Sequence, residues 1–582
     1  MATADGDLGP GRDCNIVIVG CGIAGIAAAQ RLMEHGFGRV RIIEATERCG
    51  GRIWSHSFGE NGAVMDRAAA KQHASLARSR ATAANEHRAV KGLVEIGAQW
   101  IHGPSKRNAV FQLAGQYGLL DETAMSEENQ AVQLDTHLPA MTTWYTSSGK
   151  RIDPEIAASM EDLYSTLCLK SREFFQSKKE PVQSLGEFLK CEIAQCAESW
   201  KDNEELCSLK LALLNVEFKL ECCVAGTDSL DLLALQPYGE YVMLPGIDCT
   251  FPRGFNSLID EMMKPLPKNL VSFNKSVKCI HWNGSFETPA ALKQSYPVVV
   301  ECEDGKSIPA DHVIVTVPLG NVPFEIHFPN KLHRLATHRF DPGLNTGFLK
   351  EHYKAFFYPP FLPSKTNSIQ KMGFGTIDKI FLEFDEPFWE PEYDLIKLVW
   401  EDESPLNDRP PDLQKTWFRK VLGFIVLKPA ERYGHVLLAV LTGQEANLME
   451  QLSDSDVKDC LTQIIHQFTG NPSIPPPKSI VQGSTTFTTG RAIWTHFPQK
   501  RKHWEPQRMR LRSHGLPTPG IVRSKWYSDR FTKGSYSYVE VGSSGDDIDV
   551  IAQPLPSTSA EEQAFTADRT KHNRINEELH TT

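Results

Sequence analysis

The sequence predicts a mixed α/β fold of two domains, and three observations support this prediction. A short apolar segment at residues 15–19 leads into a glycine-rich turn. An alanine-rich stretch with helical periodicity follows at residues 26–36, and a second β-like run at residues 39–43 completes a β-α-β unit. Beyond this unit, β-rich and helical stretches alternate along a chain of 582 residues, which is ample for two domains.

The glycine-rich turn has the spacing G-x-G-x-x-G, formed by Gly20, Gly22 and Gly25. The first glycine permits the tight turn, the second lets backbone approach a pyrophosphate, and the third lets the helix pack close to the strands. The unpaired N–H groups at the start of the helix attract phosphate. The turn therefore predicts a Rossmann-type dinucleotide-binding unit, and we include Ile23 and Ala24 among its cofactor contacts.

An acidic residue ends the second predicted strand. Glu44 lies 19 residues after the last glycine of the turn, where a carboxylate can accept hydrogen bonds from both ribose hydroxyls. Ala45 follows it as a further candidate contact. The sequence then continues as E-x-x-x-R-x-G-G-R, with Arg48, Gly51 and Arg52. An enzyme that binds NAD does not need this extension, and a solvated basic loop is the alternative interpretation.

Further elements are expected along the rest of the chain. Helical periodicity extends from residue 107 to residue 207 and is broken by Pro154 and Pro181. Strands are expected at residues 271–273, 298–302, 312–317, 379–384 and 435–441.

The extension after Glu44 resembles the signature of the flavin amine oxidase family, and other segments resemble the polyamine oxidase branch of that family. Residues 97–104 read G-A-Q-W-I-H-G-P, and further motifs in the family's order occur at 218–223, 237–241, 374–384 and 533–538. These residues look closer to vertebrate acetylpolyamine oxidases than to spermine oxidases. The resemblance covers residues 14–59, 92–320, 348–481 and 522–556.

The resemblance implies a two-domain architecture and an activity. The FAD-binding domain would comprise residues 14–110, 250–320 and 522–556, and the inserted substrate domain residues 111–249 and 348–481. The activity would be FAD-dependent oxidation of acetylated polyamines such as acetylspermine and acetylspermidine. A hydride would pass from the amine to flavin, water would hydrolyse the imine to an aminoaldehyde and a shorter polyamine, and dioxygen would reoxidise the flavin, releasing hydrogen peroxide.

The resemblance also implies roles for residues outside the dinucleotide motif. Lys379 would hold water near the flavin, and His102 would lie at the substrate channel. Glu221 would attract the polyamine cation. The aromatic side chains near the substrate, which can attract ammonium groups, would be Tyr238, Tyr241 and Tyr536. The remaining cofactor contacts would be Gly97, Ala98, Gln99, Trp100, Val277 and Trp526.

Each of these roles has a plainer alternative. Lysines at strand ends are often exposed, so Lys379 could simply end a strand. His102 could be a structural histidine, and Glu221 could form a surface salt bridge. Any single aromatic residue is more often part of a core. The chain also has Ile377 where the family usually has Asn, which removes a possible hydrogen bond to the amine.

Several stretches depart from the family pattern. Residues 61–91, 321–347 and 482–521 are interpreted as insertions. The last of these interleaves basic and aromatic residues, as single-strand nucleic-acid surfaces do. A solvated loop or disordered insert is the favoured interpretation, and a partner-binding loop is the next alternative. The family continues after Pro554 into a G-E-x-T/H segment and a closing helix at the flavin. Here residues 557–582 are polar and are expected to be disordered, as is the tail at residues 1–13.

Composition and net charge limit the kinds of partner that the chain is expected to bind. The net charge of −10 argues against general nucleic-acid affinity, and thirteen cysteines without paired C-x-x-C spacing argue against a metal site. No signal peptide and no apolar run long enough for a membrane are expected. We expect a monomer that binds a polyamine and dioxygen. The cytosol is the expected location, with the peroxisome second, because the last residues do not resemble a peroxisomal tripeptide.

Other functions stay open. A spermine oxidase would share most of the motifs. A monoamine oxidase would need a flavin-attaching cysteine and usually a C-terminal membrane helix, and an NAD oxidoreductase would leave the R-C-G-G-R and W-I-H segments unexplained. A catalytically silent, flavin-free variant that binds partners is the alternative from a different class. The visible absorption of flavin would separate it from an enzyme.

Overall fold

The computed structural model describes residues 13–57, 92–132, 141–177, 181–287, 294–318, 355–407, 412–478 and 522–555. The three expected insertions, the C-terminal tail and all but the last residue of the N-terminal tail lie outside these ranges. In the described ranges the chain is a mixture of helices and sheets, which confirms the predicted fold class.

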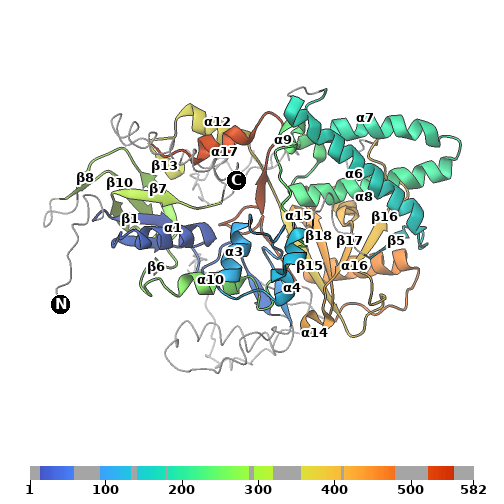
Figure 1. The fold of residues 1–582 in the computed structure, drawn as a ribbon, viewed down its shortest axis with the longest axis horizontal. Helices are drawn as coiled ribbons and strands as arrows, with labels where there is room; N and C mark the ends of the chain where they lie inside the picture. Colours follow the sequence, from blue (N-terminus) through green and yellow to red (C-terminus); the bar gives the residue numbers. More distant parts are fainter. Residues whose placement is uncertain are drawn as a thin grey trace, which may run out of the picture.

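The predicted dinucleotide-binding unit forms a four-stranded parallel sheet in the order β12-β1-β2-β6, at the left of Figure 1. Its strands are β1 (Ile16–Val19), β2 (Val40–Ile43), β6 (Val271–Ser272) and β12 (His312–Val315), and α1 (Ile23–Glu34) connects β1 to β2. All of β1 is buried, as is usual for a parallel strand that is covered on both faces. The β-α-β unit and the strand at 312 therefore lie where the sequence predicted them.

A second, mixed sheet packs against the first. It has the order β11-β10-β7-β13, formed by β7 (Val277–His281), β10 (Val298–Cys302), β11 (Ser307–Ala310) and β13 (Phe357–Tyr358). One apolar cluster joins Val17 and Val19 of the first sheet to Val277 and Val300 of the second. The segment after residue 355 therefore lies beside residues of the predicted FAD-binding domain.

Two helices on this side of the molecule are fastened to each other by a buried lysine. They are α12 (Pro363–Lys371) and α17 (Gly545–Ala552). Lys365 donates hydrogen bonds of 2.7–2.9 Å to the carbonyl groups of Val550, Ile551 and Gln553 at the end of α17. A cation favours the carbonyl end of a helix, where acceptors lack partners.

A group of long helices occupies the upper right of Figure 1. It contains α6 (Pro154–Ser177), α7 (Leu185–Ala197), α8 (Glu204–Ala225) and the short α9 (Leu235–Tyr238), around one large apolar cluster. Pro154 begins α6 instead of breaking a helix, because the first helical position needs no N–H donor. The helix α8 ends at Gly226, whose φ of +74° suits glycine.

A six-stranded sheet lies beneath these helices, in the order β19-β15-β18-β17-β16-β5. Its strands are β5 (Thr142–Thr146), β15 (Ile377–Phe384), β16 (Leu395–Val399), β17 (Gly423–Val426), β18 (His435–Thr442) and β19 (Val522–Arg523). Ile380, Leu382 and Phe384 of β15 pack in the cluster that includes α16 (Asp454–Thr469), whereas Phe381 belongs to a different cluster. The two faces of β15 therefore pack in different clusters, in the alternation of a β-strand.

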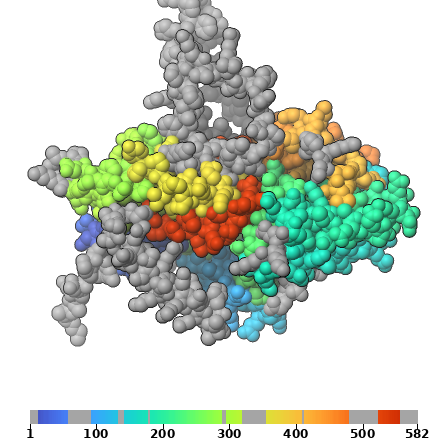
Figure 2. Space-filling view, turned by 90° about the horizontal axis from the view of Figure 1, so that it is seen from above, coloured from blue at the N-terminus to red at the C-terminus, as the bar shows by residue number. Residues whose placement is uncertain are grey.

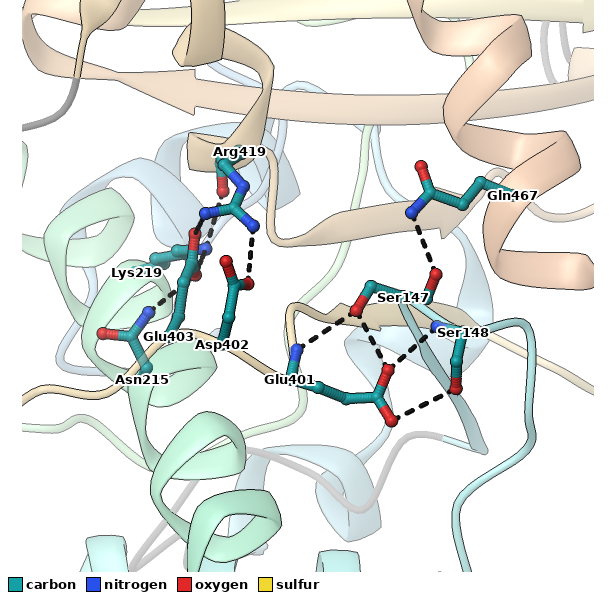
Figure 3. A network of polar contacts seen from close by, with 9 residues as sticks. All are labelled: Ser147, Ser148, Asn215, Lys219, Glu401, Asp402, Glu403, Arg419 and Gln467. Atoms are coloured by element: carbon teal, nitrogen blue, oxygen red, sulfur yellow. Dashed lines mark hydrogen bonds and ion pairs between the residues drawn. The ribbon is translucent and has the colours of Figure 1, made fainter.

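Three consecutive acids after β16 bind different parts of the chain, and the third of them contacts α8 (Figure 3). Glu401 accepts hydrogen bonds from Ser147 and Ser148 after β5. Asp402 pairs with Arg419, and Glu403 pairs with the buried Lys219 of α8. A buried lysine is stable only when its charge has a partner, so this contact fixes α8 over the sheet.

The last described segment lies between the two halves of the molecule. Figure 2 shows residues 522–555, in red, between the region of α12, in yellow, and the long helices, in teal. Within it, β20 (Tyr536–Tyr538) pairs with β14 (Gly373–Gly375), which directly precedes β15. Among the helices that the structure describes, none is both long and apolar enough to cross a bilayer.

Candidate functional site

Each glycine of the dinucleotide motif occupies its position for a different geometric reason. Gly20 has a φ of +105°, a conformation that L side chains rarely adopt. A Cβ atom on Gly25 would lie 2.1 Å from the carbonyl oxygen of Gly20, so only glycine allows this approach. A Cβ atom on Gly22 would meet nothing within 4 Å. The space beside Gly22 is therefore open, where the sequence predicts the diphosphate.

Glu44 is buried, and its two carboxylate oxygens bind two different loops. Oε2 accepts a 2.8 Å hydrogen bond from the backbone N–H of Cys21, and Oε1 accepts from the backbone N–H and the hydroxyl of Thr46. Each carboxylate oxygen has more than one acceptor direction, so further donors such as ribose hydroxyls can still bind. Glu44 thus links the turn before α1 to the loop after β2.

The two arginines of the E-x-x-x-R-x-G-G-R segment differ in their surroundings. The guanidinium of Arg48 donates to the carbonyl groups of Cys49, Gly51 and Ile53, and it lies 4.8 Å from the ring of Trp54. Burial lowers the pKa of this guanidinium. Arg48 therefore stabilises its own loop by donating to the backbone carbonyl groups of that loop.

The guanidinium of Arg52 lies against the backbone at Ser535. Its side chain is exposed, yet the surrounding protein lowers the pKa of its guanidinium. It donates a 2.6 Å hydrogen bond to the carbonyl of Ser535, and among the described residues it has no ion pair. A cation within protein walls and without an acidic partner suits an anionic ligand.

Lys379 lies beside residues 95–99, as part of the same site. Its ammonium group donates to the carbonyl groups of Glu95 (3.1 Å) and Gly97 (2.8 Å) and to the side-chain oxygen of Gln99 (2.8 Å). It lies 5.4 Å from the ring of Trp100. Burial lowers the pKa of Lys379 to about 7, against the charge of Glu95, which raises it. The lysine can therefore carry or release a proton near neutral pH.

Two further predicted cofactor residues lie in the same place. The indole of Trp526 is buried and makes an edge-to-face contact with Trp54 at 6.4 Å. A Cβ atom on Gly97 would lie 1.8 Å from the carbonyl oxygen of Arg52 and 3.4 Å from the indole of Trp526. Gly97 is therefore glycine because the two loops approach each other here. Lys379, Gly97, Gln99, Trp100, Arg52 and Trp526 form one site.

His102 lies at the edge of this site and is exposed. Its Nδ1 atom lies 2.6 Å from a carboxylate oxygen of Asp248, and this hydrogen bond raises the pKa of His102. His102 is therefore not buried in a core.

Three of the predicted substrate residues meet near the end of α8. Tyr238 donates a 3.1 Å hydrogen bond to Glu221, and burial raises the pKa of both side chains. Tyr536 donates to the carbonyl of Cys223 and lies against Gly226. Tyr241 lies outside this group: its side chain is 60% exposed. The hydrogen bond from Tyr238 and the desolvation of Glu221 argue against the alternative that Glu221 forms a surface salt bridge.

The remaining predicted contacts are spread around the dinucleotide unit. Val277 is buried in the cluster that joins the two sheets on the left of Figure 1. Ile23 and Ala24 begin α1, Ala45 follows Glu44, and Ala98 is exposed beside Gln99.

The structure also adds residues that sequence reasoning missed. Asp378, fully buried beside Lys379, accepts hydrogen bonds from the hydroxyl of Ser524 (2.7 Å) and the backbone N–H of Trp526 (3.3 Å). Burial, and next the carboxylate of Glu450, raise the pKa of Asp378 well above its usual value. Glu450 in turn accepts from the backbone N–H groups of Tyr527 and Ser528. In the sequence, the only indication of a role for Asp378 was its position next to Lys379.

The site fits a flavin dinucleotide. Open space beside Gly22 and the buried acceptor Glu44 match the diphosphate and the ribose. Arg52, which has no ion pair among the described residues, matches an electron-rich ring. No group of three or more His, Cys, Asp and Glu residues in the described ranges has metal-binding geometry.

Comparison with known proteins agrees with this geometry. Residues 23–567 match the family of flavin containing amine oxidoreductases. The peroxisomal N(1)-acetyl-spermine/spermidine oxidases of Bos taurus and Homo sapiens are each 44% identical to the chain; the alignments cover 94% of this chain and 88% and 87% of those proteins. Probable polyamine oxidase 5 of Arabidopsis thaliana is 25% identical over 94% of this chain and 89% of its own length. The chain therefore belongs to the flavin-containing amine oxidoreductase family, as its motifs predicted.

Proposed function

We propose that the chain is an FAD-dependent polyamine oxidase that acts on acetylated polyamines in polyamine catabolism. The names of the two mammalian relatives support acetylspermine and acetylspermidine as substrates. The observation that carries the proposal is Lys379, a partly buried lysine that meets Gly97, Gln99 and Trp100. This arrangement supports a titratable cation beside the flavin ring.

Three features of the chain would hold the cofactor. Gly22 and the start of α1 would face the diphosphate, Glu44 the ribose, and Arg52 the electron-rich edge of the flavin ring. When bound, the flavin supplies the acceptor for the hydride of the amine and passes the electrons to dioxygen, which gives hydrogen peroxide.

Lys379 would control the proton and the water at this position. Its three acceptors hold the ammonium group in one orientation. When charged, it would donate to a water molecule in place of one of these acceptors, and because its pKa lies at about 7 it can accept a proton when neutral. The hydrolysis of an imine needs such a positioned water.

Glu221 and Tyr238 would form the polar end of the substrate site. Desolvation raises the pKa of Glu221, against the hydrogen bond from Tyr238 and the charge of Arg172, which both lower it. An ammonium group that reaches this position would stabilise the ionised carboxylate. The hydrogen bond from Tyr238 fixes the orientation of that carboxylate, and Tyr536 would cover the neighbouring space.

The remaining partners follow from the same proposal. Dioxygen is the second substrate. We infer a monomer, without affinity for nucleic acid or membrane, that works in the cytosol; the peroxisome is the second location, and the names of both mammalian relatives support it. Fluorescence microscopy of the tagged chain beside a peroxisomal marker decides between the two locations.

A spectrum and a substrate series test the proposed function. We expect the purified full-length chain to show the visible flavin band. Addition of N1-acetylspermine without oxygen should bleach this band, and addition in air should release peroxide. Spermine and benzylamine are the control substrates for the spermine oxidase and monoamine oxidase alternatives. A preference for either control, or a colourless protein that cannot be loaded with FAD, overturns the proposal.

A further inference from the structure

The two loops of the dinucleotide motif carry a close pair of thiols. Cys21 lies between Gly20 and Gly22 in the glycine-rich turn, and Cys49 lies between Arg48 and Gly50 in the loop after β2. Their Sγ atoms are 2.9 Å apart. Both cysteines are free thiols in this structure.

The backbone holds the two thiols face to face. Gly22 and Gly50 form a parallel β-bridge, and the N–H of Gly50 donates a 2.8 Å hydrogen bond to the carbonyl of Cys21. Cys21 and Cys49 are therefore the next pair in that register. Neighbouring strands lie about 4.8 Å apart, within the span of about 4.4–6.8 Å between the Cα atoms of a disulfide. The flanking glycines can absorb the small shift that a covalent bond requires.

We propose that Cys21 and Cys49 are a peroxide-reactive pair whose disulfide locks together the two loops that hold the dinucleotide. The oxidant is hydrogen peroxide, which the proposed oxidase activity releases; the expected effect on FAD therefore rests on the proposed function. This pair lies outside the catalytic residues described above and would record the protein's own turnover.

The unequal exposure of the two thiols sets the order of the reaction. Cys21 is fully buried, whereas Cys49 is partly exposed. The thiolate of Cys49 attacks peroxide, breaks the O–O bond and becomes a sulfenic acid, while the released hydroxide takes up the thiol proton as water. The sulfur of Cys21 then displaces the sulfenic hydroxyl, which leaves as water with the proton of Cys21. Two thiols and one peroxide thus give one disulfide and two waters.

The disulfide would hold the cofactor cradle closed. The N–H of Cys21 donates to Glu44, and the carbonyl of Cys49 accepts from Arg48, so both residues are already part of the loops that surround the dinucleotide. In this proposal, a bound dinucleotide leaves when these two loops separate. A covalent link between them opposes that separation, so oxidised protein should release FAD more slowly than reduced protein.

Mass spectrometry tests the bond directly. The full-length chain is treated with hydrogen peroxide, remaining thiols are alkylated, and the peptides are mapped without reduction. We expect one peptide pair joined through Cys21 and Cys49, lighter by two hydrogen atoms than the sum of its parts and separated by dithiothreitol. Cys49→Ala and Cys21→Ala should each abolish it. Cys191→Ala, which removes an exposed thiol on α7, should leave it intact.

FAD release gives the second readout. The half-time for loss of flavin fluorescence quenching after dilution should lengthen on oxidation in the parent and in Cys191→Ala, and should not change in Cys49→Ala. Separate alkylation of both thiols after peroxide treatment, or a disulfide that leaves FAD release unchanged, overturns the proposal. If the chain holds no FAD at all, the proposed function fails, and the peptide map alone decides whether the pair reacts.

Discussion

The ammonium group of Lys379 donates a 2.8 Å hydrogen bond to the side-chain oxygen of Gln99. This contact connects the six-stranded sheet to the segment after β4 (Leu93–Glu95), two parts of the chain that are 280 residues apart. Gln99 is buried, and two backbone carbonyl groups complete the environment of the lysine. Among the described residues no carboxylate bonds directly to this lysine, and desolvation disfavours its charged form and lowers its pKa. Enzymes obtain proton donors that work near neutral pH in this way.

Replacement of Lys379 by Met should therefore lower the reaction rate more than it lowers the stability of the fold. Met keeps much of the apolar stem and removes the charge. We expect the rate of flavin reduction by acetylspermine, or of reoxidation by dioxygen, to fall at least about tenfold, equivalent to ~1.4 kcal/mol of barrier. Stopped-flow absorbance measures both half-reactions. Lys428→Met, which removes an exposed lysine from the same half of the molecule, is the control, and unchanged rates in both half-reactions of Lys379→Met would rule the role out.

The same lysine predicts how stability depends on pH. Its pKa is about 7 in the folded chain and ~10.4 when unfolded. Between these values the unfolded chain binds the extra proton, so this group makes folding more favourable as pH rises from 7 towards 10. Denaturant titrations of the parent and Lys379→Met at both pH values measure the difference. The parent should gain stability relative to the variant, and equal gains in the two proteins would contradict the shifted pKa.

Glu44 should support cofactor binding in addition to its own loop. Glu44→Ala removes the acceptor of Cys21 and Thr46 and, in the loaded protein, the acceptor for ribose hydroxyls. Hydrogen bonds to a charged group contribute roughly 1.5–3 kcal/mol each, so FAD affinity should fall at least about tenfold. Fluorescence titration of FAD measures this, and the melting temperature of the apoprotein separates the effect on the loop. Glu47→Ala, at an exposed position three residues later, is the control. Equal FAD affinity of Glu44→Ala and the parent would refute the assignment.

Asp378 should stabilise the fold as a neutral acid. Its raised pKa means that the folded chain keeps a proton that the unfolded chain releases above pH ~4, so this stability is present at low pH and is lost as pH rises towards the folded pKa. Asp378→Asn keeps the acceptor for Ser524 and Trp526 and cannot ionise. Unfolding measured at pH 5 and pH 8 should show a smaller loss for Asp378→Asn than for the parent. Identical losses would mean that Asp378 is ionised in both states.

Much of the fold was predictable because local patterns and tertiary packing agree there. The turn at Gly20 and the strand at Lys379 have periodicities that the core requires, and both elements formed at the expected residues. The strand β5 was missed, since its residues pair with β16 about 250 positions later and nothing local separates them from the helical region. Pro154 was misread as a helix break, because a proline that starts a helix looks the same in the sequence.

The site was predictable to the extent that motifs named its residues. The family resemblance named Lys379 and Trp526, and the structure brings both to the segment around Gly97. It did not indicate Asp378, whose role depends on Glu450 some 70 residues away. Nor did it indicate the pairing of Cys21 with Cys49, because only the β-bridge between the two loops sets their register. Contacts between motifs that are distant in the sequence depend on the tertiary fold, so the sequence alone did not indicate them.

Glu221 should set the affinity for a cationic substrate. Its carboxylate is surrounded by helices, receives a hydrogen bond from Tyr238 and has a raised pKa because of burial. Glu221→Gln keeps the shape and removes the charge, so the KM for acetylspermine should rise while flavin binding stays unchanged. A change of about tenfold corresponds to ~1.4 kcal/mol, within the range of one hydrogen bond to a charged group. Glu192→Gln, whose carboxylate forms a surface pair with Lys170 on the same group of helices, should leave KM unchanged. Steady-state peroxide release against acetylspermine concentration gives both values. If Glu221→Gln has the KM of the parent, the carboxylate does not contact the substrate, and its hydrogen bond with Tyr238 only holds α8 against α9.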